Sequence, residues 1–247
     1  MPVTPSTNRS TRRVRKVLTT RRGGCSAPPY DSFNLGMHVG DDPDAVLENR
    51  HRLARGLGLH PSRLVWMDQT HSTHLAVVGK PQSAPVPDTD AIITTCPDLA
   101  LVVLVADCVP VLLSDEDAGV IAAVHAGRQG ARNGIVAATV ERMVRLGADV
   151  SRIHALLGAA ASGHWYEVPE EMAADVEKHL PGSRTTTAAG TPGLDIRAGL
   201  VHQLYDLGVT KVDSEPRCTI AEQDYFSHRR DGVTGRQAGV VVLQTQR

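Results

Sequence analysis

The 247-residue sequence has no CxxC pair, no long apolar run and no excess of charge of either sign. Its four cysteines lie far apart in a chain too large to depend on disulfide bonds, so we expect reduced thiols and a cytoplasmic protein. No segment approaches the roughly 18 apolar residues that span a bilayer. The net charge of -1 gives no electrostatic case for nucleic acid or a membrane surface as a partner. We therefore expect a small-molecule partner; the sequence defines no oligomeric state.

The first 22 residues contain seven basic side chains and no acidic one, but no apolar stretch long enough for a signal peptide. The segment VRKVLTTR already has the pattern of a short strand. We therefore predict a disordered basic tail over residues 1–11 and a single domain over residues 12–247, since no linker or internal repeat interrupts the rest.

Short apolar runs with β-branched residues dominate the middle of the chain. They predict strands at LVWMDQ, LAVVG, DAIITT, LALVVLVA, PVLLS and GVIAAVHA, and later at RIHALLGA, TKVDSE and GVVVL. Helices are predicted at GIVAATVERMVRLG, with Val136, Val140, Met143 and Val144 inward, at PEEMAADVEKHL, and from Asp195 to Gly208. Residues 185–193 are expected to form a polar loop. Strands in close succession argue against a simple βαβ repeat, so the fold class is α/β (α+β), with mixed sheets flanked by helices.

Another helix is expected after Asp42, the candidate N-cap, with Pro43 in its first turn and Gly56 just past its end. Arg50 falls on the apolar stripe of this helix, so its guanidinium either extends to the edge or meets an anion in a pocket, and we favour the pocket. The stripe comprises Val46, Leu47, Leu53, Ala54 and Leu57.

Three residues that can bind metal, His71, Cys108 and His125, each lie at the polar end of a strand-like run. Alone, each has at least even odds of a purely structural role. Together, two imidazoles and one thiolate suit zinc, and three protein ligands leave a position for water or substrate. His74 would lie on the opposite face from His71 in an extended segment, so we leave it out of the ligand set.

Motifs along the chain, in order, include TTRRGG, NLGMHVGDDP, ENR, QTHSTH, DAIIT, ADCVP, HAGRQG, YEVPEE and YFSHRRDGVTGRQAG. From about Thr19 to Val242 the sequence resembles the YfiH family, also called the laccase-domain or multicopper polyphenol oxidase family. The resemblance implies a fold similar to the cytotoxic necrotizing factor catalytic domain and a zinc ion bound by the residues that match His71, Cys108 and His125. It also implies phosphorolysis of adenosine, inosine, guanosine or methylthioadenosine to a free base and a pentose 1-phosphate, together with adenosine deamination. Related proteins are described as polyphenol oxidases and as editors of peptidoglycan precursors.

Deamination needs hydroxide at neutral pH, which zinc can provide, and a group that transfers protons. Asp107 and Glu167 are the candidate proton-transfer residues, although Glu167 also suits the start of a helix. The chain lacks the HxE and PCxxC pattern of nucleic-acid deaminases, so a different site would carry out the reaction.

Phosphorolysis needs cations that hold phosphate, and guanidinium groups match phosphate geometry. The candidate substrate-binding residues are Asn34, Arg50, Arg128, Ser227, Arg229 and Arg230, with Arg236 as a further cation. The family's HAGWRG and GPAIG are HAGRQG and GAAAS here, which puts base stacking and phosphate contact near Arg128 in question.

Three alternatives stay open. A metal-free cysteine hydrolase would use Cys108 as nucleophile and His125 as base, and an amidase acting on cell-wall precursors is a variant that could use either this mechanism or the zinc ion. A noncatalytic zinc-stabilised protein ranks last, because three ligands leave the metal accessible. Copper ranks below zinc: the set could form one His2Cys site, but no HxH or HCH pair supports the trinuclear cluster of a laccase.

Overall fold

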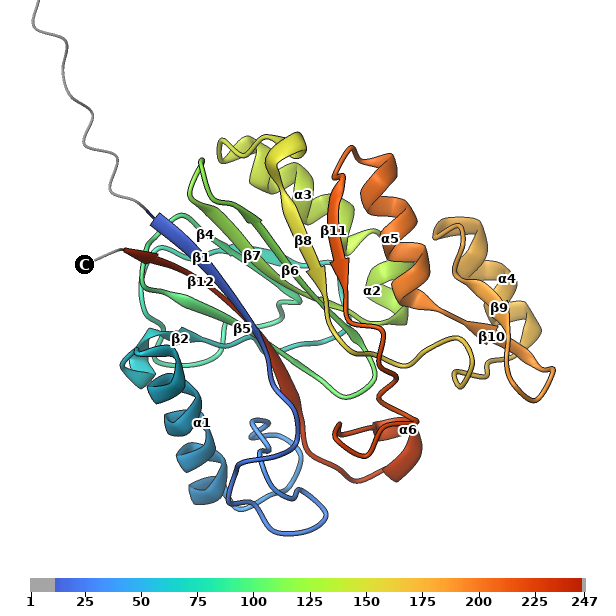
Figure 1. The fold of residues 1–247 in the computed structure, drawn as a ribbon, viewed down its shortest axis with the longest axis horizontal. Helices are drawn as coiled ribbons and strands as arrows, with labels where there is room; N and C mark the ends of the chain where they lie inside the picture. The colour runs from blue at the N-terminus through green and yellow to red at the C-terminus, as the bar shows by residue number, and fades with distance from the viewer. Residues whose placement is uncertain (1–11, 246–247) are drawn as a thin grey trace, which may run out of the picture.

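The computed structural model describes residues 12–245, so the tail predicted over residues 1–11 lies outside the described residues. Two mixed sheets form the centre of the molecule (Figure 1). The four-stranded sheet has the order β1 (Arg12–Leu18), β12 (Gln237–Thr245), β5 (Ala100–Val105) and β2 (Leu64–Val65). The six-stranded sheet has the order β11 (Lys211–Ser214), β8 (His154–Leu157), β6 (Val109–Asp115), β7 (Val120–Ala126), β4 (Ala91–Thr94) and β3 (Leu75–Val77).

The two sheets pack face to face. This is seen from their strands, in which successive side chains point into different cores. In β5, Leu101, Val103 and Val105 face the core between the sheets. The alternate residues Ala100 and Val102 face a second core, which helix α1 covers. Both faces of these strands are buried, which explains why they are continuous apolar runs in the sequence.

Helices cover the two outer faces and give four layers in all. Helix α1 (Pro43–Leu57) covers the four-stranded sheet, whereas α3 (Ile135–Arg145), α4 (Glu170–His179) and α5 (Ile196–Asp206) pack on the core of the six-stranded sheet (Figure 1). The short elements are α2 (Arg128–Arg132), α6 (His228–Asp231), the 3-10 turns η1 (Pro61–Arg63) and η2 (Val150–Arg152), and the paired strands β9 (Arg184–Thr186) and β10 (Pro192–Leu194). The expected mixed sheets with flanking helices are confirmed. None of the helices within residues 12–245 is long and apolar enough to cross a membrane.

The structure differs from the expectation in four places, three in helices and one in a loop. Helix α1 continues through Gly56, and Gly58, with a φ of 73°, is its cap. The carboxylate of Asp42 caps the start of this helix as predicted, and Asp195 caps α5. Leu47 and Val144, expected inward, are 44% and 41% exposed because each lies at the edge of its helix's buried face.

The fourth difference is the polar loop expected at 185–193. Its two ends pair as the antiparallel strands β9 and β10, with Gly193 opposite Thr185. A hairpin therefore replaces the loop.

Candidate metal centre and cavity

A cavity of about 560 Å³ lies where the two sheets, helix α6 and several loops meet, and its volume is in the range of small-molecule sites. The three candidate ligands lie in its wall, in three separate segments. His71 belongs to the loop before β3, Cys108 ends the 106–108 turn that leads from β5 of one sheet to β6 of the other, and His125 is in β7. The pairing of β6 with β7 places Pro110 opposite His125, which brings the thiol and the imidazole together.

The geometry of the three side chains fits a tetrahedral metal ion. One ligand atom from each of His71, Cys108 and His125 lies within 4.8 Å of the others. Sγ of Cys108 is 3.8 Å from Nε2 of His71. Zn–S and Zn–N bonds of about 2.3 and 2.05 Å at a tetrahedral angle place S and N about 3.6 Å apart. The residues therefore fit a metal with a fourth position facing the cavity.

Over residues 12–245 this is the only group of three such side chains whose ligand atoms lie close enough to hold a metal. His74 lies outside it, as expected, and its Nδ1 is 2.8 Å from Oδ2 of Asp88 on an exposed part of the loop. The left-handed conformation of His71, with a φ of 62°, separates the two histidines, rather than the strand alternation on which the prediction relied.

The cavity environment changes the proton affinities of the ligands. Burial alone would raise the pKa of the Cys108 thiol, but His125 and His71 lower it to about 6. Burial opposes the charging of His125, yet Cys108 and Asp90 raise its pKa to about 9. The thiolate form that metals bind is thus favoured at neutral pH.

Asp90, in the DAIIT motif, is the main residue that sequence analysis missed. Its side chain is fully buried, and Oδ1 accepts a hydrogen bond of 2.7 Å from Nδ1 of His125. Burial opposes its ionisation, but hydrogen bonds from His125 and Ser72 hold the pKa of the carboxyl well below its usual range. The only signal in the sequence was an acidic residue directly before a buried strand.

Three of the predicted or considered cations line the cavity: Arg128, Arg229 and Arg236. Arg128, at the first position of α2, has no hydrogen-bond or ion-pair partner among the residues that the structure describes. The guanidinium of Arg229 lies 4.9 Å from the ring centre of Tyr166, which also lines the cavity. Arg236 donates to the carbonyl oxygens of Thr234 and Gly235. The cavity can therefore bind an anion near the metal ligands.

Arg50 does not line this cavity. Its guanidinium lies 3.8 Å from the centre of the Trp66 ring, and its Nε donates to the carbonyl oxygen of Leu35 at 2.9 Å. Burial lowers its pKa to about 10. The guanidinium of Arg50 is thus buried, as we favoured, but it contacts an aromatic face and a carbonyl group instead of an anion in a pocket.

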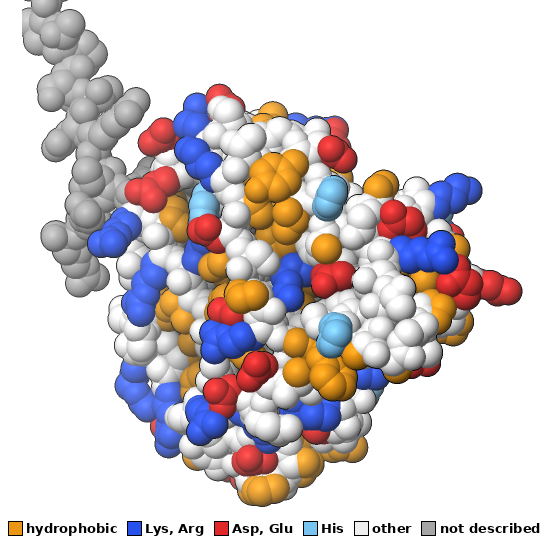
Figure 2. Space-filling model, turned by 45° about the vertical axis from the view of Figure 1, so that its right-hand side comes forward, with side chains coloured by type: hydrophobic (Ala, Val, Ile, Leu, Met, Phe, Trp, Pro, Cys, Tyr) orange, Lys and Arg blue, Asp and Glu red, His pale blue; other side chains and the backbone are white. Residues whose placement is uncertain are grey.

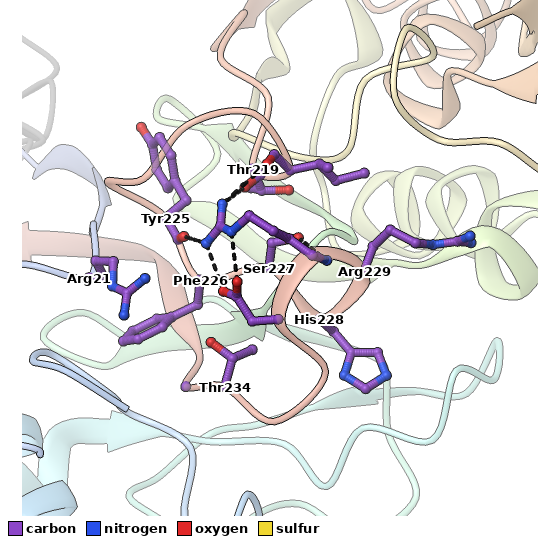
Figure 3. A network of polar contacts seen from close by, with 12 residues as sticks. Arg21, Thr219, Tyr225, Phe226, Ser227, His228, Arg229 and Thr234 are labelled. Atoms are coloured by element: carbon purple, nitrogen blue, oxygen red, sulfur yellow. Dashed lines mark hydrogen bonds and ion pairs between the residues drawn. The ribbon is translucent and has the colours of Figure 1, made fainter. Parts of the chain in front are cut away.

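Arg230, Ser227 and Asn34 also point into the protein instead of the cavity. The guanidinium of Arg230 donates to the carbonyl oxygens of Thr219 and Tyr225. The neighbouring Arg229, by contrast, is directed away from Tyr225 (Figure 3). Ser227 is fully buried, and its Oγ caps α6 by accepting from the Arg230 amide. Buried Asn34 bonds the Gly36 and Arg236 backbones and Asp41, so it supports the loop beside Arg236.

The two candidate proton-transfer residues differ in position. Asp107 lines the cavity, has a φ of 89°, and accepts hydrogen bonds from Thr219 Oγ1 at 2.6 Å and from the Arg229 amide at 2.7 Å. Glu167 is exposed and does not line the cavity, and its backbone pairs with Gly193 of β10.

Several polar residues of the cavity wall had no sequence-based assignment, although they fall in or beside the quoted motifs. These are His38, Asp68, Gln69, Tyr166 and His228. The face shown in Figure 2 mixes basic and acidic side chains.

Fold and site together define a four-layered α/β protein with a three-ligand candidate metal centre in a cation-lined cavity. Residues 15–244 match the family described as multi-copper polyphenol oxidoreductase laccase, and the chain belongs to this family. It is 64% identical over 234 residues to a purine nucleoside phosphorylase of Corynebacterium glutamicum, covering 94% of this chain and 95% of the relative. A purine nucleoside phosphorylase of Mycobacterium tuberculosis is 57% identical over 232 residues, with 94% and 93% covered.

Solved structures of the same fold agree. YfiH of Bacillus licheniformis superimposes with a TM-score of 0.87 at 30% identity, covering 94% of this chain and 93% of that one. YlmD of Geobacillus stearothermophilus gives a TM-score of 0.88 at 31% identity, with 94% and 92% covered.

Proposed function

We propose that this chain is a purine nucleoside phosphorylase that holds a zinc ion with His71, Cys108 and His125, and that it deaminates adenosine at the same site. The relatives named purine nucleoside phosphorylase, at 57–64% identity over nearly the whole chain, support the reaction class. The observation that carries the proposal is the cavity itself, which is lined both by the three ligand residues and by Arg128, Arg229 and Arg236. Phosphorolysis needs cations that hold phosphate, which the guanidinium groups supply, and the metal ligands would hold the zinc that deamination uses.

Zinc is favoured over copper by the ligand set. A multicopper oxidase needs a trinuclear cluster with many histidines, whereas residues 12–245 contain one three-ligand group. Histidine nitrogen and cysteine sulfur are both zinc ligands, and catalytic zinc is typically held by three protein ligands with one position open. Zinc bound here would supply a Lewis acid and a nucleophilic water near neutral pH.

The cavity residues then act on substrate and phosphate. The guanidinium groups of Arg128 and Arg229 bind phosphate, since their planar donors match its oxygens. Tyr166 provides an aromatic face for the purine. In the deamination, Asp107 transfers protons, because it lines the cavity and each of its oxygens keeps a lone pair beyond its bond to Thr219 or Arg229.

The test combines metal analysis with product analysis. Purified protein should contain about one zinc per chain. It should convert adenosine to inosine without phosphate, and release free base only when phosphate is present. Cys108→Ser should lose zinc and lower turnover more than about 100-fold, beyond the effect typical of outer residues. Cys96→Ser, a half-buried cysteine away from the cavity, is the matched control and should retain both. Zinc-loaded protein that is inert to adenosine, inosine and guanosine with phosphate would rule the proposal out.

A second candidate, a cysteine hydrolase, is favoured by one observation. Cys108, His125 and Asp90 form a thiol–imidazole–carboxylate series, with the thiol pKa lowered to about 6. This reading requires activity without metal. Rapid alkylation of Cys108 by iodoacetamide, with amide hydrolysis that persists in chelator, would favour it, including its variant as an amidase of cell-wall precursors. Loss of all activity in chelator would exclude it.

A further inference from the structure

We propose that Asp90 is the positioning residue that holds both histidine ligands of the candidate metal centre in place. The inference rests on the metal-binding part of the proposed function. The carboxylate is fully buried and has six hydrogen-bond contacts, all with three consecutive loop residues and His125; in the longest, at 3.3 Å, the Thr70 hydroxyl shares its one proton with Asp88. No lysine or arginine pairs with it among the described residues. These donors alone therefore stabilise its charge.

On the strand side, Asp90 fixes the imidazole of His125. Nδ1 of His125 donates to Oδ1 at 2.7 Å, and the His125 amide donates to the Asp90 carbonyl oxygen, also at 2.7 Å. A proton on Nδ1 leaves the lone pair on Nε2, the nitrogen available for a metal. A carboxylate bound to the far nitrogen orients such a ligand and raises its basicity.

On the loop side, Asp90 fixes the backbone of His71. The amides of Thr70, His71 and Ser72 donate to the same carboxylate at 3.2, 3.1 and 2.7 Å. Successive N–H groups can converge on one anion where the chain turns through a left-handed residue. His71 is that residue, with a φ of 62°, a conformation uncommon outside glycine. The turn directs its imidazole toward His125, and the two rings meet edge to face with centres 4.7 Å apart.

The charge and shape of a carboxylate are both required at this position. Every group that contacts it is a donor, so an asparagine at position 90 would place its own NH2 against an N–H or the His125 proton. Asp90→Asn is nearly the same size, and it should therefore loosen both histidines without opening a cavity. A buried donor left without a partner is unfavourable, so some loss of stability is also expected.

The experiment measures zinc affinity by competition with a chromophoric chelator, for the whole chain and for matched variants. Asp90→Asn should bind zinc about 10- to 100-fold more weakly than the wild type. Asp88→Asn is the control: it makes the same change two residues away, on an exposed carboxylate that bonds His74 and Thr70. It should bind zinc as the wild type does. Visible spectra of the cobalt-substituted proteins should show altered d–d bands for Asp90→Asn alone, which a general loss of stability would not produce.

Unchanged zinc affinity in Asp90→Asn, or an equal loss in Asp88→Asn, would overturn the inference. If Asp90→Asn does not fold, Ser72→Ala removes one of the six contacts, the 2.8 Å bond from Oγ, and should weaken zinc binding by a smaller factor. No weakening in Ser72→Ala would then overturn it. A wild-type protein that binds no zinc overturns the metal site and this inference together, whereas a zinc-binding wild type with an unaffected Asp90→Asn variant overturns only the role of Asp90.

Discussion

The lack of a side chain at Gly127 leaves the space in which His71 and Cys108 approach each other. A Cβ atom at this position would lie 2.9 Å from Cδ2 of His71 and 3.0 Å from Sγ of Cys108. The φ of Gly127 is -73°, which any residue adopts, so crowding is the only obstacle to a side chain. Gly127→Ala should therefore displace the ligands and weaken zinc binding about 10- to 100-fold, as outer-residue changes at metal sites do. Competition titration measures it.

Gly56→Ala is the control for this change. Gly56 lies inside helix α1, and a Cβ there meets nothing within 4 Å. The control should keep the zinc affinity of the wild type and stabilise the helix by about 0.5–1 kcal/mol. Equal zinc affinities of Gly127→Ala and the wild type would mean that the ligands do not need the space at Gly127.

Single residues also show what sequence can and cannot predict. His71, Cys108 and His125 could be grouped as candidates because each lies at the polar end of a strand-like apolar run in the sequence, although the structure places His71 in a loop. Whether a polar side chain has protein partners cannot be deduced in this way. Ser227 and Arg230 were assigned to substrate, but the structure shows them bonded within the 219–231 segment. Asp90 was not assigned, because the three amides that surround it lie in a distant loop.

Among the elements, buried strands were predictable and helix edges were not. Strands β5, β6 and β7 are buried on both faces, so their apolar runs are continuous and easy to recognise. In helix α1 a fully buried polar residue, Asn49, occupies the inner face where the pattern favoured apolar residues. Its amide donates to Ser26 Oγ and to the carbonyl oxygens of Ser32 and Asn34, contacts with a loop that periodicity cannot reveal.

Lys16 connects an edge strand of one sheet to the other sheet. Nζ in β1 lies 2.6 Å from Nδ1 of His154 in β8, and Nε2 of His154 lies 2.9 Å from Oδ2 of Asp213 in β11. Burial lowers the pKa of Lys16 from 10.5 to about 7, against a smaller opposing effect of Asp213. Between pH 7 and 10.5 the unfolded chain thus binds more protons at Lys16 than the folded chain does, and stability rises with pH over this window.

Lys16→Met should remove this rise. The wild-type free energy of unfolding should gain up to about 1.4 kcal/mol per pH unit from Lys16 over the window, and the variant should lack that contribution. The stability difference between variant and wild type should therefore be largest near pH 7 and shrink toward pH 10. Urea unfolding at pH 7, 8.5 and 10 measures it. Lys80→Met, an exposed lysine, is the control, and parallel pH profiles for all three proteins would contradict the lowered pKa.

At the scale of the whole molecule, the candidate metal centre joins parts that are far apart in the sequence. The turn at 106–108 connects the two sheets, and the cavity also takes His38 from the loop before α1 and Arg236 from the segment before β12. Strands β1 and β12, near the two ends of the described chain, pair along their length (Figure 1). The order of the motifs in the sequence indicated that these segments belong to one fold. Only the packing of the two sheets in the structure shows that the segments line one cavity.

If residues 12–247 form one domain, as we predict, metal binding at this centre should stabilise the whole of it. Because no ligand triplet exists in the unfolded chain, zinc at 100 times its dissociation constant should add about 2.7 kcal/mol to the unfolding free energy. For a chain of this length that corresponds to a rise in Tm of about 5–10 °C. If residues 12–247 form a single domain, calorimetry should show one transition that moves as a whole when zinc replaces chelator. Two transitions, of which only one responds to zinc, would instead divide the chain into a metal-binding unit and a second unit that folds independently.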